Sequence, residues 1–270
     1  MALIQCQFNS EVLGINTSMT VILPQETINQ IGMKGKAFAG KHPTLFLLHG
    51  FSDDDTIWSR RTSLERYAAS LGIAVVMPNA HKSFYTDMEY GDPYWTFLTE
   101  ELPQVARSFF PLSDDPKLNF VAGLSMGGYG AFKWALTHPD RFAAAASLSG
   151  VLDIAALKAN PSNPAIGRAF DLIFGERAVT GSPDDLFELL GRLPRGSAEL
   201  PELYQCCGTE DFLYEDNIRF RDAIRKAGYP NYRYEEGPGD HEWGYWDAHI
   251  QEALALFGRK AKERMASMEG

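Results

Sequence analysis

The sequence predicts an α/β protein with a mainly parallel central sheet and helices on both faces. Short β-rich runs alternate with helical patterns along the 270 residues, which is the pattern typical of parallel sheets. Two of these runs, 44–48 and 73–77, are apolar at every position except Thr44, as expected for strands buried on both faces. Hydrophobic residues make up 45% of the chain and charged residues 22%, so the composition is that of a globular protein.

The charge and cysteine content exclude several classes of partner. The net charge is −10, from 25 Lys and Arg against 35 Asp and Glu. An acidic chain repels phosphate backbones and anionic lipids, so we expect neither nucleic acid nor a membrane as a partner. The first residues lack the basic and apolar regions of a signal peptide, and the three cysteines form no CxxC pair. We therefore expect a cytoplasmic protein with reduced thiols and no bound metal.

The expected elements follow in order along the chain. An amino-terminal pair of strands is expected at 3–8 and 19–23, and a polar surface loop at 24–43 separates it from the first buried strand. An aromatic-rich loop over 79–97 leads to a helix over 98–109, with Pro103 tolerated in its first turn. Further strands are expected at 118–122, 143–148, 203–207 and 232–236. Further helices are expected after Ser125, around 218–227 and at 246–257.

One stretch, 151–200, is longer than a simple connection between strand and helix and contains four prolines. We predict one domain over residues 1–270, with 151–200 as a partly helical, cap-like insertion over one end of the sheet. Insertions of this kind often shape a substrate pocket.

The segment 118–130 carries the motif that predicts chemistry, Gly-x-Ser-x-Gly at Gly123, Ser125 and Gly127. It follows a buried-strand pattern and opens a helix, which is the setting of a nucleophile elbow. A serine on this tight turn projects its hydroxyl above the sheet, and the glycines remove Cβ atoms where strand and helix nearly touch. The helix N-terminus beside the serine favours a developing oxyanion. The motif predicts an α/β hydrolase fold with Ser125 as nucleophile.

A serine hydroxyl is a poor nucleophile at neutral pH and needs a base. Of the six histidines, His241 lies in a turn-rich loop after the last predicted strand, where an α/β hydrolase carries its base. Asp211 follows the preceding predicted strand, so the order Ser125, Asp211, His241 is that of α/β hydrolases. This order favours Asp211 as the acid that orients the base. Two rival acids remain, Glu210 and Asp216.

Two backbone N–H groups are expected to form an oxyanion hole. One belongs to Met126, directly after the nucleophile, and the other to Phe51, in the turn after the first buried strand. Gly50 lets this turn approach the site closely. Among the aromatic side chains, Trp95 and Trp243 are the candidates to line an acyl or aryl pocket.

Several segments together resemble a known family. They are His49-Gly50-Phe51, Tyr85-Thr86-Asp87, Thr99-Glu100-Glu101-Leu102-Pro103, Gly123 to Gly130, Gly208 to Tyr214 and His241-Glu242-Trp243. This combination, spread over nearly the whole chain from about residue 5 to 258, resembles the putative esterase (esterase D) family. It is most similar to the bacterial tributyrin esterase branch, which includes feruloyl esterases. The resemblance implies a cofactor-free triad of Ser125, Asp211 and His241 and carboxylesterase activity on short acyl esters.

We therefore predict a serine carboxylesterase whose partner is a small-molecule ester, and a homo-oligomer stays open. S-formylglutathione hydrolases belong to the same wider family and usually carry a cysteine soon after the His-Gly turn. This chain has Ser52-Asp53-Asp54 there, a departure from that pattern, so hydrolysis of the thioester is kept as the alternative and ester hydrolysis is the first prediction. Acyl transfer from the same acyl-enzyme and a non-catalytic binding scaffold are two further hypotheses.

Overall fold

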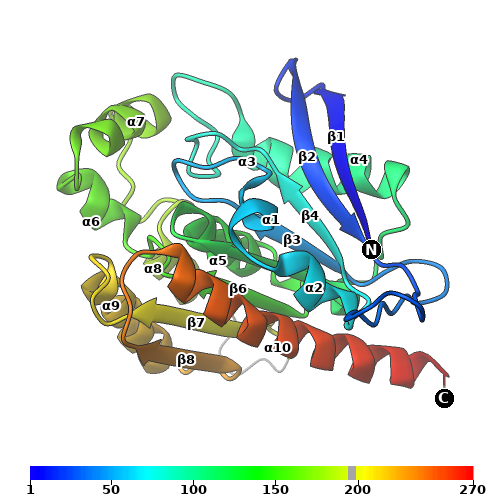
Figure 1. Cartoon of the computed structure of the whole chain (residues 1–270). Helices are drawn as coiled ribbons and strands as arrows, with labels where there is room; N and C mark the ends of the chain where they lie inside the picture. Colours follow the sequence, from blue (N-terminus) through cyan, green and yellow to red (C-terminus); the bar gives the residue numbers. More distant parts are fainter. Residues whose placement is uncertain (194–198, 270) are drawn as a thin grey trace.

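The computed structural model describes residues 1–193 and 199–269. Its strands are β1 (Ala2–Ser10), β2 (Ile15–Leu23), β3 (Thr44–Leu48), β4 (Ala74–Pro78), β5 (Asn119–Leu124), β6 (Ala144–Leu148), β7 (Glu202–Gly208) and β8 (Tyr232–Gly237). They form one eight-stranded sheet in the order β1-β2-β4-β3-β5-β6-β7-β8. The hairpin β1–β2 and the pair β2–β4 are antiparallel, and the other neighbours are parallel. The predicted fold class is confirmed: this is an α/β hydrolase fold (Figure 1).

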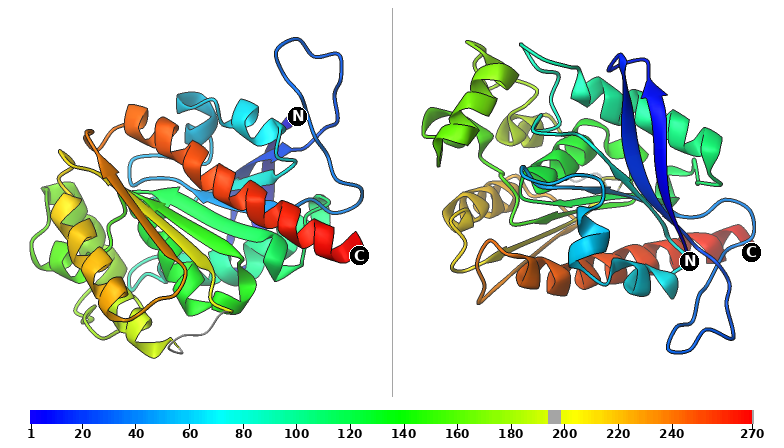
Figure 2. Two further views of the ribbon diagram at one scale, coloured as in Figure 1. Left: turned by 90° about the horizontal axis from the view of Figure 1, so that it is seen from below. Right: turned by 45° about the horizontal axis from the view of Figure 1, so that its top comes forward.

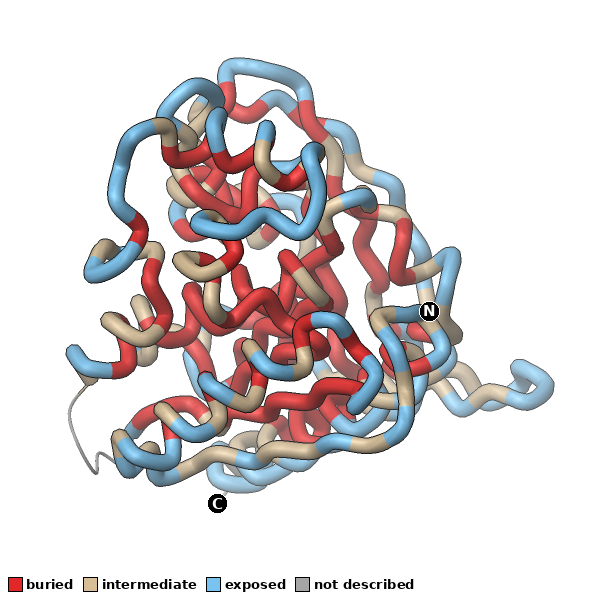
Figure 3. The backbone as a smooth tube through the Cα atoms, turned by 90° about the vertical axis from the view of Figure 1, so that its left-hand side faces the viewer, coloured by how far each residue is buried: buried red, intermediate tan, exposed pale blue. Residues whose placement is uncertain are grey.

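Helices cover both faces of the sheet. They are α1 (Ile57–Arg61), α2 (Leu64–Ala69), α3 (Tyr94–Thr96), α4 (Leu102–Phe109), α5 (Met126–Thr137), α6 (Ile154–Ala159), α7 (Pro164–Phe174), α8 (Leu186–Arg192), α9 (Tyr214–Lys226) and α10 (Trp243–Glu269). Figure 2 shows α10 lying along one face of the sheet, and Figure 3 shows that the buried backbone runs through the middle of the molecule. No described helix combines the length and the apolar character that crossing a membrane requires.

The alternation of side chains along β3 explains the two layers. Leu45 and Leu47 point to the side of α10, where they pack in one hydrophobic cluster with Phe257. Phe46 and Leu48 point to the opposite side and belong to the cluster that α5 closes. Successive strand residues face opposite sides of a sheet, so a strand that is apolar at every position is buried on both. The continuous apolar runs in the sequence therefore mark the centre of the sheet.

The helix predicted over 98–109 begins earlier and is not regular. Helix α3 continues through a π-helical turn, Phe97–Glu101, directly into α4. Pro103 therefore lies inside a continuous helical stretch rather than in its first turn. A proline has no N–H to donate and its ring crowds the carbonyl four residues earlier, which is that of Thr99. The wider turn accommodates this, and the Thr99 carbonyl accepts a hydrogen bond from Arg141 Nη1 instead, at 2.7 Å.

Between β6 and β7 the chain forms α6, α7 and α8. In Figure 1, α6 and α7 stand apart from the sheet on the side to which β7 points, while α8 lies beside α5. The partly helical character expected of 151–200 is thus present in its described residues. The assignment of the whole chain to one domain stays a prediction.

Candidate active site

Ser125 sits on the turn between β5 and α5 with φ 53° and ψ −118°. A non-glycine residue in this region of backbone space is strained, and strain of this kind persists only where the surroundings impose it. Here the Ser125 N–H donates to the Leu148 carbonyl at 2.9 Å, and the Ser125 carbonyl accepts from Tyr129 and Val151 at 3.1 and 3.2 Å. These three backbone bonds fix the serine at the end of the strand with its hydroxyl exposed to a pocket.

The glycines around Ser125 are required by close packing. A Cβ atom on Gly123 would lie 2.3 Å from the carbonyl oxygen of Gly127, and one on Gly127 would lie 2.4 Å from the Leu48 carbonyl oxygen. Both distances are far inside van der Waals contact, and both obstacles are backbone atoms. The reason for Gly-x-Ser-x-Gly given from the sequence therefore agrees with the geometry.

The structure brings Ser125, His241 and Asp211 together. His241 Nε2 lies 3.0 Å from Ser125 Oγ, and His241 Nδ1 lies 2.8 Å from Asp211 Oδ2. The Asp211 side chain is fully buried and that of His241 is 16% exposed. With a carboxylate at Nδ1, the proton of a neutral imidazole is on Nδ1, and the Nε2 lone pair faces the hydroxyl. Asp211 itself is held by the Leu213 N–H at 2.8 Å from Oδ1.

The two rival acids lie elsewhere. Glu210 is exposed, and its carboxylate accepts a hydrogen bond from the backbone N–H of Gly239. Asp216 forms an ion pair with Arg219 at 2.6 Å on the first turns of α9. Asp211 alone of the three contacts the imidazole.

The two candidate oxyanion donors have free N–H groups. Met126 is the first residue of α5, and the N–H groups of the first helical turn have no partner within the helix. No described group accepts a hydrogen bond from the Phe51 N–H. Phe51 and Gly50 line the same pocket as Ser125. A Cβ atom on Gly50 would lie 2.7 Å from Leu124 Cδ1, so a larger residue here would force the Leu124 side chain to move.

A buried histidine holds the turn that carries Phe51. His49 Nδ1 donates to the Gly50 carbonyl at 2.7 Å, while Nε2 accepts from the Ala80 N–H at 3.0 Å. Both bonds need a neutral ring with its proton on Nδ1. Burial lowers the pKa of His49 to about 4, so the ring is neutral at physiological pH. His49 thus ties the Phe51 turn to the segment after β4.

Ser125 and His241 open into a pocket of about 350 Å³. Its walls are mostly apolar and aromatic, and they include side chains from the inserted helices. The apolar and aromatic side chains of the wall are Phe51, Phe84, Leu124, Val151, Leu157, Ile166, Phe212, Trp243 and Trp246, of which Leu157 comes from α6 and Ile166 from α7. Trp243 is therefore where the sequence prediction put it. Phe212 was not predicted, although it directly follows Asp211 and its ring lies 4.5 Å from the His241 ring.

Trp95 requires a correction, because it does not line this pocket. Its ring stacks on His138 with centroids 6.2 Å apart, and the ammonium of Lys133 lies 4.1 Å from its centroid. Lys133 is buried, and an aromatic face stabilises a buried cation. The packing of α3 against α5 therefore takes Trp95 away from Ser125.

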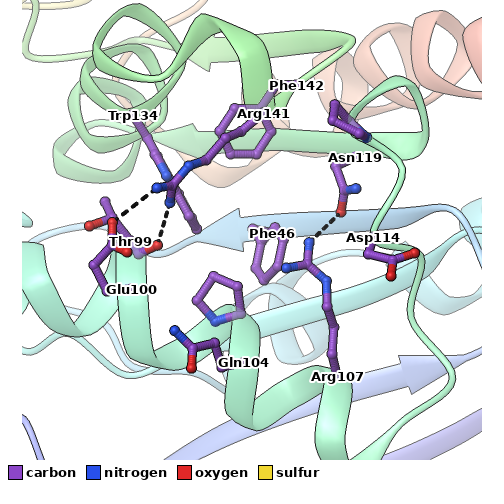
Figure 4. A pocket seen from close by; sticks show the side chains of 12 residues that line it. Phe46, Thr99, Glu100, Gln104, Arg107, Asp114, Asn119, Trp134, Arg141 and Phe142 are labelled. Carbon is purple, nitrogen blue, oxygen red and sulfur yellow. Dashed lines mark hydrogen bonds and ion pairs between the residues drawn. The ribbon is translucent and has the colours of Figure 1, made fainter.

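A separate cavity of about 300 Å³ lies at the other end of the strands (Figure 4). Asn119, the first residue of β5, is in its wall, whereas Ser125 follows the last residue of that strand. Its two arginines already have partners: Arg141 bonds to Glu100 and Thr99, and Arg107 bonds to Asn119. Among the described residues, no group of three or more His, Cys, Asp or Glu is arranged to hold a metal ion.

The fold and the arrangement at Ser125 define the chain as an α/β hydrolase. The model of the putative esterase family matches residues 10–188. The chain belongs to this family, and its enzyme class is that of the carboxylic ester hydrolases.

The chain is similar to several known proteins over nearly its whole length. It is 30% identical to an acetyl esterase from Caldicellulosiruptor saccharolyticus over 260 residues, which cover 94% of this chain and 97% of the relative. Two solved structures from Staphylococcus aureus are each 38% identical and cover 95% of this chain and 98% of their own. One is the substrate-bound fluorophosphonate-binding serine hydrolase FphF, with a TM-score of 0.84. The other is the S-formylglutathione hydrolase FrmB, with a TM-score of 0.80.

Proposed function

We propose that this protein is a serine carboxylesterase that hydrolyses short-chain acyl esters with Ser125 as nucleophile, His241 as base and Asp211 as orienting acid. The observation that carries the proposal is the continuous line of hydrogen bonds from the buried Asp211 carboxylate through the imidazole to the serine hydroxyl. A hydroxyl in this position has a base within reach, and the base has a group that fixes its tautomer.

The reaction follows from this geometry. His241 Nε2 takes the proton of Ser125 while Oγ attacks the ester carbonyl carbon, and Asp211 stabilises the imidazolium that forms. The N–H groups of Phe51 and Met126 donate to the oxyanion of the tetrahedral intermediate. When this intermediate collapses, Nε2–H protonates the leaving alkoxide oxygen, the alcohol departs and an acyl-enzyme remains. Water then attacks the acyl-enzyme by the same route, and the acid and free serine are released.

The pocket supports small acyl or aryl esters. Its volume of about 350 Å³ is at the small end of the range for ligand sites. The acetyl esterase relative supports a short acyl group. The rings of Trp243, Trp246 and Phe212 suit an aromatic group such as feruloyl, because aromatic rings pack well edge to face.

Initial rates on 4-nitrophenyl esters from acetate to decanoate, with methyl ferulate beside them, test this function. We expect fast turnover of the shortest esters or of the ferulate, and a loss of several orders of magnitude in Ser125→Ala. Ser108→Ala, an exposed serine on α4, is the matched control and should keep full activity. A fluorophosphonate probe should label the wild type and Ser108→Ala but not Ser125→Ala. Esterase activity that survives in Ser125→Ala would refute the proposal.

A second candidate is hydrolysis of S-formylglutathione, supported by the 38% identity to FrmB. The same acyl-enzyme route applies, with a thiolate instead of an alkoxide as leaving group. S-formylglutathione should therefore be assayed beside the ester series at equal concentrations. A kcat/KM for the thioester far above every oxygen ester would move the function to this candidate.

A further inference from the structure

Apart from the cavity in Figure 4, a second cavity of about 630 Å³ adjoins the serine pocket. The two share Phe51, Ser52 and Asp53 as a common wall. The two cavities therefore lie next to each other, on either side of these three residues. Its other walls come from the segment 81–94 and from α7. They are formed by His81, Lys82, Ser83, Met88, Gly91, Asp92, Tyr94, Ala165, Arg168, Ala169 and Leu172.

Two cations in this cavity have no counter-ion. Lys82 comes from the loop after β4 and Arg168 from α7, and neither forms an ion pair with a described carboxylate. The Lys82 ammonium instead lies over the Phe51 ring, 5.1 Å from its centroid. The neighbouring Arg177, in contrast, forms an ion pair with Glu89 at 3.0 Å. The free charges of Lys82 and Arg168 are thus available to a ligand.

The loop that carries Lys82 is strained and firmly held. Its backbone is bonded on both sides, by the Ala80 N–H to His49 Nε2 at 3.0 Å and by Lys133 Nζ to the Tyr85 carbonyl at 3.1 Å. Positive φ values at non-glycine residues are costly and persist where the surroundings impose them. Three such residues occur in this short segment: His81 at 47°, Phe84 at 49° and Tyr85 at 51°. Lys82 is therefore presented on a rigid loop, which limits the entropy lost when a ligand binds.

The cavity also contains two carboxylates. Asp53 lies in the common wall, on the side of Ser125. Its pKa is raised because burial outweighs the opposing effect of a hydrogen bond from the Gly50 backbone. Asp92 lies beside Tyr94 at the other end of the segment 81–94 and contributes to the raised pKa of that phenol, after burial. Since neither acid pairs with Lys82 or Arg168, the charges of opposite sign stay separated within the cavity.

We propose that this second cavity is a substrate subsite for a negatively charged group, such as a carboxylate or phosphate, bound by Lys82 and Arg168. The proposal rests on the proposed function, since it concerns the same reaction at Ser125. One part of the ester, acyl or alcohol, lies among the aromatic rings of the serine pocket. The other part extends past Phe51, Ser52 and Asp53 and carries the negative charge. The planar guanidinium can bind such an anion with two hydrogen bonds, and the ammonium adds a point charge.

Matched pairs of esters test the subsite for the acyl part and for the alcohol part of the substrate. On the acyl side they are 4-nitrophenyl hydrogen glutarate and its methyl ester, and on the alcohol side 3-acetoxybenzoate and methyl 3-acetoxybenzoate. Each kcat/KM is divided by the rate of the same ester with hydroxide, which removes differences in intrinsic reactivity. In the wild type we expect a preference of about tenfold for the anionic member of at least one pair, as two partly exposed ionic contacts would give. Added salt should reduce this preference.

The variants Lys82→Met and Arg168→Met keep an apolar stem and remove the charge. The double variant should bring the preference down to about one while the neutral ester is still hydrolysed, which shows that the fold is intact. Lys117→Met is the matched control, because Lys117 is an exposed lysine in the wall of a different cavity. A wild-type ratio of one or less in both pairs, or a preference unchanged in the double variant, would overturn the subsite. If the wild type hydrolyses neither member of either pair, the proposed function itself has failed.

Discussion

The imidazole of His241 lies 3.0 Å from the hydroxyl of Ser125, although 116 residues separate the two in the chain. The contact exists because both residues follow parallel strands at the same edge of the sheet. Ser125 follows the carboxyl end of β5. His241 follows the carboxyl end of β8, which is the outermost strand and is separated from β5 by β6 and β7. The fold thus supplies the proximity that the proposed base requires.

Replacing Asp211 by asparagine should lower kcat by about 10³ to 10⁴-fold, because an amide cannot stabilise the imidazolium and favours the wrong tautomer. KM should change little, since Asp211 is buried behind the ring and lies outside the pocket walls. Steady-state kinetics on 4-nitrophenyl acetate measure both constants. Asp216→Asn, which loses only the ion pair with Arg219, is the control and should keep most of its turnover. Equal losses in the two variants would contradict the assignment of the acid.

Gly127→Ala should destabilise the fold by about 1–3 kcal/mol or more, as overpacking does. The reason is that the added methyl group would lie 2.4 Å from the Leu48 carbonyl oxygen. Gly191→Ala is the opposite control, since no atom lies within 4 Å of a Cβ at this position in α8. There alanine should stabilise by about 0.5–1 kcal/mol, because it has the higher helix propensity. Urea unfolding followed by circular dichroism measures the free energy of unfolding, which should fall in Gly127→Ala and rise in Gly191→Ala.

Lys133 and Asp184 form a nearly buried ion pair, with Nζ and Oδ1 2.6 Å apart and side chains 3% and 15% exposed. Lys133→Met should cost about 3–5 kcal/mol, because it leaves a carboxylate without its counter-ion. The double variant Lys133→Met/Asp184→Asn should recover part of this loss. Urea midpoints of the two single variants and the double variant give the coupling energy. A loss in Lys133→Met below that of an average surface substitution would show that the pair contributes no stability.

Stability should fall between pH 6.5 and 4 in a way that His49 controls. Burial lowers the pKa of His49 from 6.5 to about 4 in the folded state, so in this range the unfolded chain binds a proton that the native state excludes. The stability is therefore complete above pH 6.5 and is lost progressively as the pH falls towards 4, by up to about 3 kcal/mol.

The variant His49→Gln tests the acid sensitivity. Glutamine can accept from the Ala80 N–H and donate to the Gly50 carbonyl but does not titrate. The difference in unfolding free energy between pH 7 and pH 4.5 should be smaller in this variant than in the wild type. An unchanged difference in His49→Gln would show that other groups cause the loss of stability at low pH.

The sequence predicted those parts of the molecule that local patterns determine. The buried strand expected at 44–48 is found there, and the strand expected at 118–122 is found as Asn119–Leu124. Ser125, Asp211 and His241 could be chosen because chain order and strand ends place them at one edge. Trp95 was misplaced because its position depends on a buried cation from another helix, Lys133. The second cavity also has no local signal, since a loop after β4 and an inserted helix form it only when packed together.

The late position of His241 in the chain has a consequence for biosynthesis. During translation Ser125 leaves the ribosome 116 residues ahead of its base, and until then its hydroxyl is an ordinary alcohol. A nascent or truncated chain without β8 and the loop after it therefore cannot acylate itself on cellular esters. The appearance of fluorophosphonate labelling thus reports that His241 has reached Ser125, which requires β8 to have joined the sheet.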